Sequence, residues 1–208
     1  MTITKKTRLL PAPFVGTRIT IKLDDPESLD WGINVLSLAG GSSFALIDWG
    51  DGTTEQTNGA ISPVHTYQSC GTYEVVLSDD IETLCFTTGS SESPFRMYGK
   101  RILAIRSRAQ NLDSLSTYSL CECDNLTIFD FRHSSLKSLS PRALYKCFNI
   151  MGALYLPPSL ISLGANSFGN CTGITELHFS KAQEETIKAL QGYDKAFGAV
   201  NAAVYFDL

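Results

Sequence analysis

The second half of the chain repeats its hydrophobic positions at a fixed period. Three segments share the pattern Leu-x-Ser-Leu, and their leading residues Leu112, Leu136 and Leu160 are 24 residues apart (136 − 112 and 160 − 136). Further apolar positions recur in each unit, at Leu120, Leu144 and Phe168, at Cys123, Cys147 and Cys171, and at Leu126, Ile150 and Ile174. This period predicts a solenoid of stacked coils, because a single unit cannot bury its apolar face alone.

Each unit closes with two apolar residues on either side of one residue that we expect to point outward. The pairs are Phe129 with Phe131, Leu154 with Leu156, and Leu177 with Phe179, and the middle pair comes one residue late. Alternation of this kind predicts a short strand with one buried face. Earlier in the unit, Ser140 and Pro141 suit the start of a single short helix that ends near Cys147. Each coil is therefore predicted to be turn, helix and strand.

Both ends of such a stack need covering. Ser180 to Gln183 has the pattern of a capping box, which predicts a helix through about Leu190, and residues 203–206 predict a last strand. Residues 101–105 predict the strand of a partial first coil. The result is a short solenoid of about four coils.

The first half has a different pattern, with short alternating runs separated by Gly and Asp turns. The predicted strands cover residues 18–23, 33–38, 44–48, 73–77 and 84–86. Several short strands in so little chain favour an antiparallel β-sandwich. We therefore predict two modules: an all-β sandwich over residues 1–95 and an α/β solenoid with a helix–strand cap over residues 96–208.

The repeat units resemble the BspA-like leucine-rich repeats of bacterial surface proteins. The fullest copy runs from Leu160 through Phe168 and Cys171 to Phe179, and the resemblance covers roughly residues 100–180. The resemblance implies a leucine-rich-repeat fold and an extracellular or cell-surface location.

The first half carries a second resemblance, to the PKD (polycystic-kidney-disease) domain, which has an immunoglobulin-like fold. It rests on residues 48–53 (Asp-Trp-Gly-Asp-Gly-Thr), on residues 65–67 (His-Thr-Tyr) and on residues 71–77, within about residues 15–90. Asp51 and Gly52 favour a turn, and His65 a structural hydrogen bond. A calcium site formed by Asp48, Asp51 or the pair Asp24 and Asp25 stays open as an alternative.

Composition and charge narrow the class of protein. The net charge is −4 and the pI is about 5.4, without a concentrated basic cluster, which argues against nucleic-acid binding. We find neither an apolar run long enough to cross a membrane nor the apolar segment of a signal peptide, so we expect no membrane insertion. Retention in the cell, another export route and a removed leader all stay open.

The candidate chemistry is sparse. The three histidines, His65, His133 and His178, belong to no nucleophile, zinc or phosphate-binding motif, so we predict a protein that is not an enzyme and has no cofactor. The stacked units predict a column of buried free thiols at Cys123, Cys147 and Cys171 rather than disulfides or a metal site.

The outward residues of the repeat strands are the candidate binding surface. One row contains Asp130, Tyr155 and His178, joined by Ala104 if the partial coil exists, and Glu176 lies in the next row. Solenoids bind partners on such strand faces, while a solvated sheet face without a partner stays open as the alternative. We expect a monomer that binds a protein or a glycan as an adhesion module of a bacterial surface or secreted protein. The alternative is a structural accessory of a larger assembly, such as a phage tail or surface layer.

Overall fold

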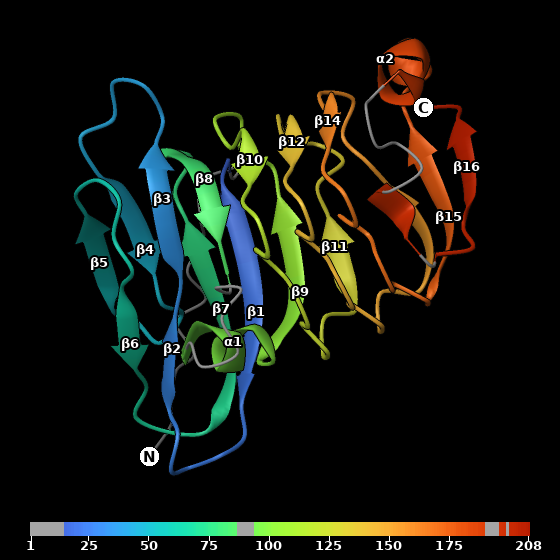
Figure 1. The fold of residues 1–208 in the computed structure, drawn as a ribbon. Coiled ribbons are helices and arrows are strands. Elements are labelled where there is room, and N and C mark those ends of the chain that lie inside the picture. The colour runs from blue at the N-terminus through green and yellow to red at the C-terminus, as the bar shows by residue number, and fades with distance from the viewer. Residues whose placement is uncertain (1–14, 87–93, 190–195, 199) are drawn as a thin grey trace, which may run out of the picture.

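The chain folds into two long β-sheet layers around one core (Figure 1). A computed structural model describes residues 15–86, 94–189, 196–198 and 200–208. The first layer contains, in sheet order, β11 (Ile128–Asp130), β9 (Ile102–Ser107), β1 (Thr17–Leu23), β7 (Gly71–Leu77), β4 (Ala45–Asp48) and β5 (Thr54–Thr57). The second contains β14 (Ser162–Leu163), β12 (Ser138–Leu139), β10 (Ser114–Leu115), β8 (Ile81–Cys85) and β3 (Asn34–Leu38).

Two smaller sheets complete the described strands. The first half also contains a pair made of β2 (Asp30–Gly32) and β6 (Val64–Thr66), while the C-terminal end has a sheet of β13 (Gly152–Tyr155), β15 (Ile174–Phe179) and β16 (Ala203–Phe206). β13, β15 and β16 pair in parallel, as the repeat strands of a solenoid do.

The strands of the first half pair antiparallel. In β1, the inward residues Ile19, Ile21 and Leu23 are buried, and the strand pairs with β7 along its whole length. The five predicted strands are all present, within one to three residues at their ends. Sequence reasoning missed β2, β5 and β6. Residues 54–57 (Thr-Glu-Gln-Thr) show why, because this strand has no apolar alternation to detect.

β8 and β9 join the two halves. β9 pairs antiparallel with β1 and parallel with β11, and β8 pairs antiparallel with β3 and parallel with β10. Both layers therefore pass from antiparallel to parallel pairing at these strands. β9 is the predicted strand of the first coil, and the boundary predicted after residue 95 falls within α1 (Pro94–Gly99).

The repeat columns lie where the period predicts them. Leu115, Leu139 and Leu163 stand side by side in β10, β12 and β14, and the six apolar residues that close the units are buried. The predicted column of buried free thiols is confirmed at Cys123, Cys147 and Cys171. The Cys147 thiol donates to the Leu120 carbonyl at 2.9 Å, and burial raises the pKa of Cys147.

The predicted short helix is wrong. Residues 141–146 form turns, in which Arg142 and Lys146 have left-handed φ angles of 58° and 61°, and the neighbouring coils repeat this at Tyr118, Glu122, Asn166 and Asn170. Backbone N–H groups of this segment donate to the next coil, as from Leu144 to Ser167 at 2.8 Å.

The spacing of the coils explains why turns replace the helix. Paired strands lie about 4.8 Å apart, whereas a helix with its side chains is about 10 Å wide. A helix in every coil would therefore spread the coils on that side and curve the stack, while turns can bond from coil to coil at the strand spacing. Residues 102–179 are all described and contain no helix. The solenoid is mostly β, and the α/β class predicted for it is corrected.

The C-terminal cap differs from the prediction in its contacts. A 3-10 turn, η1 (Lys181–Gln183), leads into α2 (Glu184–Lys188), but the Ser180 side chain makes no capping bond. Gln183 instead donates inward to the carbonyls of Pro158 and Leu160. The predicted capping box is therefore wrong, because Gln183 serves the open carbonyls of the preceding coil. The predicted last strand is present as β16, and the helix end expected near Leu190 lies outside the described residues.

The parallel sheet is interrupted between β11 and β13. Phe129 and Leu154 are 25 residues apart (154 − 129), whereas Leu154 and Leu177 are 23 apart (177 − 154). Gly152 absorbs the shift with a φ of 79°, and the pairing of β13 with β15 changes register beside it. β11 and β13 consequently belong to different sheets and are not paired.

Candidate functional site on the strand face

The predicted site residues lie on the outward surface of β9, β11, β13, β15 and β16, which we call the strand face. Asp130 ends β11, Tyr155 ends β13, and His178 and Glu176 lie in β15. Tyr155 is in register with His178, and Glu176 is in register with Ala153. The structure brings Tyr155, His178 and Glu176 together, while Asp130 lies across the interruption of the sheet.

Three rings form a continuous stack along this face, the aromatic ladder of Tyr155, His178 and Tyr205. The centroids of Tyr155 and His178 are 4.5 Å apart with planes at 19°, and those of His178 and Tyr205 are 4.9 Å apart at 16°. Parallel pairing in register puts equivalent residues side by side, which stacks the rings. Sequence reasoning missed Tyr205, although its place between Val204 and Phe206 in the last strand could have identified it.

His178 is fixed by two carboxylates as well as by the rings. Its Nδ1 lies 2.9 Å from Asp207 Oδ1, its Nε2 lies 3.0 Å from Glu176 Oε2, and its side chain is 10% exposed. Burial opposes the charge, but the hydrogen bonds to Asp207 and Glu176 outweigh it and raise the pKa of His178. A protonated ring can donate from both nitrogens at once, so this arrangement favours the charged form of His178.

An ion pair extends the ladder at its other end. Arg132 donates from Nε to Asp130 Oδ1 and from Nη2 to Asp130 Oδ2, both at 3.0 Å, and its guanidinium carbon lies 5.7 Å from the Tyr155 ring centroid. The hydrogen bonds from Arg132 lower the pKa of Asp130. Sequence reasoning missed Arg132 because it follows β11 in a loop, although it lies two residues after Asp130.

The place predicted for Ala104 is wrong. Ala104 pairs with Ile128 and is buried, whereas Arg106 pairs with Asp130 and is exposed. The cause is the length of β9, which continues two residues past the predicted end at Ile105.

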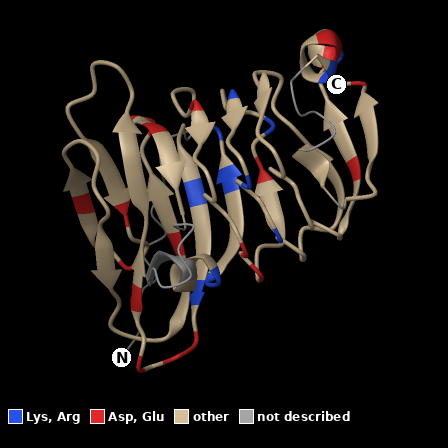
Figure 2. Ribbon diagram, viewed as in Figure 1, with Lys and Arg blue, Asp and Glu red and all other residues tan. Residues whose placement is uncertain are grey.

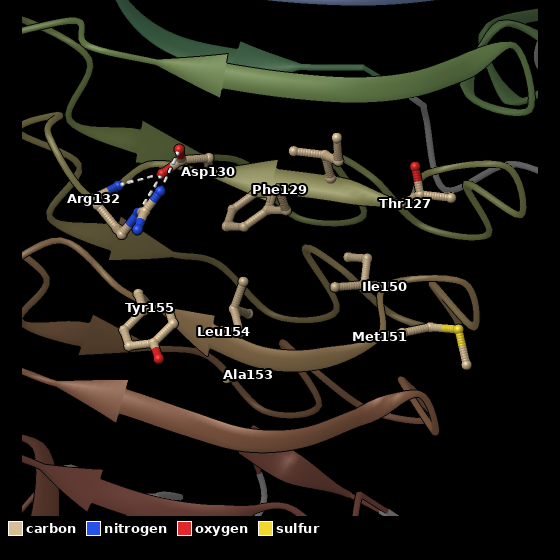
Figure 3. Close-up of a pocket in the computed structure, with 10 residues that line it drawn as sticks. Thr127, Phe129, Asp130, Arg132, Ile150, Met151, Ala153, Leu154 and Tyr155 are labelled. Atoms are coloured by element: carbon tan, nitrogen blue, oxygen red, sulfur yellow. Dashed lines mark hydrogen bonds and ion pairs between the residues drawn. The ribbon is translucent and has the colours of Figure 1, made fainter.

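A groove of about 290 Å³ lies where β11 and β13 fail to pair (Figure 3). Figure 3 shows Asp130, Arg132 and Tyr155 at one end of it and Thr127, Ile150 and Met151 at the other. Phe129 and Leu154 lie between the two ends and are nearly buried. The groove therefore has apolar side chains between its ends, mixed with polar surface, and is charged at one end.

The first-half residues on which the PKD resemblance rests form a separate cluster. His65 Nε2 lies 2.8 Å from Asp51 Oδ2, and its ring stacks on Trp49 with centroids 5.1 Å apart. Asp51 also accepts from the Thr53 N–H at 3.0 Å, and the Tyr67 hydroxyl donates to the Trp49 carbonyl. These bonds fix the turn, in agreement with the structural roles predicted for Asp51 and His65. Among the described residues, no three His, Cys, Asp or Glu side chains are grouped to hold a metal.

Comparison with known proteins supports the leucine-rich-repeat part of the fold. Residues 98–191 match the model of the BspA type leucine rich repeat region (6 copies), which agrees with the resemblance of the repeat units. No curated protein and no solved structure matches the chain. No helix in the described part of the chain is long and apolar enough to cross a membrane. The matched segment contains Tyr155 and His178, while Tyr205 follows it.

Proposed function

We propose that this chain is a non-catalytic binding module of a bacterial surface or secreted protein, and that it recognises a protein or a glycan through its strand face. BspA-type leucine-rich repeats, matched by residues 98–191, are typical of surface-associated and adhesion proteins. The observation that carries the proposal is the fixed row of Arg132, Tyr155, His178 and Tyr205 on this face.

The row suits recognition because its side chains are already ordered. Tyr and Arg are enriched among the residues that dominate binding energy at interfaces. Freezing a mobile side chain on binding costs about 0.5–1.5 kcal/mol. Tyr155 and Tyr205 are stacked on His178, and Arg132 is held by Asp130. These side chains are therefore already ordered in the free protein and lose less entropy on binding.

The bonds of His178 favour binding over catalysis. A general base needs a nitrogen that can accept a proton from the substrate. Both nitrogens of His178 face carboxylate oxygens, on Asp207 and Glu176, so its charge serves to hold the surface together.

We propose further that the first half is an immunoglobulin-like, PKD-like domain that caps the solenoid. Its antiparallel strands and its Tyr73 support this, since the Tyr73 hydroxyl donates to the Ser69 carbonyl at 2.8 Å, as a tyrosine corner does. β1 pairs with β9 and so covers the first coil, as the terminal unit of a repeat protein must.

The test is binding by the purified full chain to arrays of glycans and of extracellular proteins. We expect Tyr155→Ala to weaken a hit at least tenfold. Tyr118→Ala is the matched control, because Tyr118 also lies under an arginine, with the Arg142 guanidinium 5.3 Å from its ring, but on the turn side of the coils. Equal binding by the Tyr155→Ala variant and the parent would show that the strand face is not the site.

A structural role in a larger assembly is the second candidate, and β16 favours it. Among the described strands, β16 pairs with β15 alone, so its other edge has no partner within this part of the chain and a further strand can add there. Light scattering across a concentration series separates the two candidates. A binding module stays monomeric, whereas an assembly component associates through this edge.

A further inference from the structure

We infer that the groove between β11 and β13 receives one large apolar side chain of a partner protein, next to an acidic residue of the same partner. The inference rests on the proposed function and selects a protein over a glycan. It is carried by the groove's lining, by the bonds that occupy its polar groups, and by the charges beside it.

The interruption of the sheet creates an opening that the rest of the strand face lacks. β9 pairs with β11, β13 with β15, and β15 with β16, but β11 and β13 are unpaired. Backbone N–H and C=O groups on the two facing edges need hydrogen-bond partners. The main chain of a protein partner offers both donors and acceptors to such edges.

The groove is small and offers apolar contacts to a side chain of a partner. Its volume of about 290 Å³ lies at the lower limit for pockets that enclose whole small molecules, about 300 Å³. Phe129 and Leu154 form the floor, while Ile128 is 38% exposed and Met151 is 75% exposed. An exposed methionine adapts its shape to an apolar guest.

The polar groups at the end of the groove are already occupied, which disfavours a sugar. A sugar ring packs on a bare aromatic face and bonds its hydroxyls to uncommitted polar groups. One face of Tyr155 is covered by His178 and the ring also lies beneath Arg132, while both oxygens of Asp130 accept from Arg132.

The charges beside the groove indicate an acidic neighbour for the apolar side chain. Arg18, Arg106 and Asp130 are in register on adjacent strands. Figure 2 shows basic and acidic segments side by side on β1, β9 and β11. Arg18 bonds Glu74 and Arg132 bonds Asp130, but within the described residues Arg106 has no carboxylate partner. The exposed Arg106 guanidinium therefore offers a positive charge beside the groove for an acidic residue of the partner.

Selection from a phage-displayed random peptide library on the immobilised full chain tests the inference. We expect enriched peptides to carry Leu, Met or Phe beside Asp or Glu. Met151→Glu places a charge in the groove, and Ala153→Trp fills it with a large side chain. Both residues are exposed, so the variants should still fold. Each change should weaken the selected peptides at least tenfold. Ile161→Glu is the control, because Ile161 is 50% exposed beside β14, in the other layer.

The methionine methyl groups provide a direct readout. The chain has three methionines, so methyl-labelled protein gives three signals, and Met151→Leu assigns one of them. N-acetyl-Leu-Asp amide should shift the Met151 signal at millimolar concentration, and N-acetyl-Ser-Asp amide should shift it much less.

The outcomes separate the two claims. A Met151 shift caused by mono- and disaccharides but not by the leucine probe would overturn the inference in favour of a glycan. If the selected peptides bind the Met151→Glu and Ala153→Trp variants as well as they bind the parent, the groove is not their binding site. That result would overturn the inference but leave the proposed function standing. If no peptide is enriched and the Met151 signal does not shift, the inference is overturned. If the chain binds nothing on either the protein or the glycan array, the proposed function itself is overturned.

Discussion

The two sides of the same three coils differ in their regularity. On one side, β10, β12 and β14 keep the 24-residue spacing and pair in register from coil to coil. On the strand face, a shift of one residue separates β11 from β13 and opens the groove. The regular side supplies packing, and the irregular side supplies a surface with unpaired edges and ordered charged groups. The difference teaches that a repeat protein can confine a break in its period to one face of the stack while the other face stays regular.

The largest effect is expected from a substitution in the regular side of the coils. Leu139 is fully buried between equivalent leucines of the adjacent coils. Leu139→Ala removes packing that the stack cannot recover, and it should lower the free energy of unfolding by about 2–5 kcal/mol. Urea denaturation of the variant and the parent measures this. A loss below 1 kcal/mol would mean that the coils do not depend on this column.

Gly152 tests how the chain accommodates the break. Its φ of 79° is unfavourable for a residue with a Cβ, although the space around it is open. Gly152→Ala should therefore cost about 1–2 kcal/mol of stability through backbone strain alone. Gly40→Ala is the control, since Gly40 also has open space but no left-handed φ, and it should change stability little. Equal effects of the two changes in thermal unfolding would argue against the strained turn.

His178 links the irregular side to pH. Because the pKa of His178 is higher in the folded than in the unfolded chain, its stabilising effect is complete below its unfolded pKa of about 6.5. That effect is lost as the pH rises through the folded pKa. His178→Gln should cost about 1 kcal/mol at low pH and less at high pH. Histidine NMR titration and unfolding at several pH values check this, and a His178 pKa at or below 6.5 would contradict it.

The smallest expected effect concerns Arg132. Its side chain is 49% exposed, so its ion pair with Asp130 should contribute about 0.2–1 kcal/mol. Arg132→Gln should hardly move the unfolding midpoint, yet it should weaken partner binding, because the positive charge at that end of the groove is lost while Asp130 remains. A variant that unfolds at a much lower urea concentration than the parent would show that Arg132 stabilises the fold through packing instead.

The sequence predicted what depends on apolar spacing. The coil columns, the buried thiols, five strands of the first half and the last strand all follow from periodicity, and the outward positions of Tyr155 and His178 follow from strand alternation. The turns that replace the helix could not be predicted in this way. Their left-handed residues include Tyr118, Glu122, Arg142 and Lys146, where no glycine marks the conformation.

Long-range pairing accounts for the other differences. The join at β8 and β9 brings together segments that lie far apart in the chain, which no local pattern encodes. Arg132 reaches the ladder from a loop. The shift of one residue in the middle unit can be seen in the sequence. Its effect on the pairing of β11 and β13, however, depends on the backbone geometry at Gly152.

Amide hydrogen exchange with and without a selected peptide tests the central claim, that the unpaired edges of the strand face form the binding site. In the free protein, the amides of β11 and β13 that face the groove should exchange faster than those of β15. The peptide should slow exchange in residues 127–132 and 150–155 and leave β10, β12 and β14 unchanged. Slow exchange at β11 and β13 in the free protein, or protection gained only elsewhere, would contradict the account.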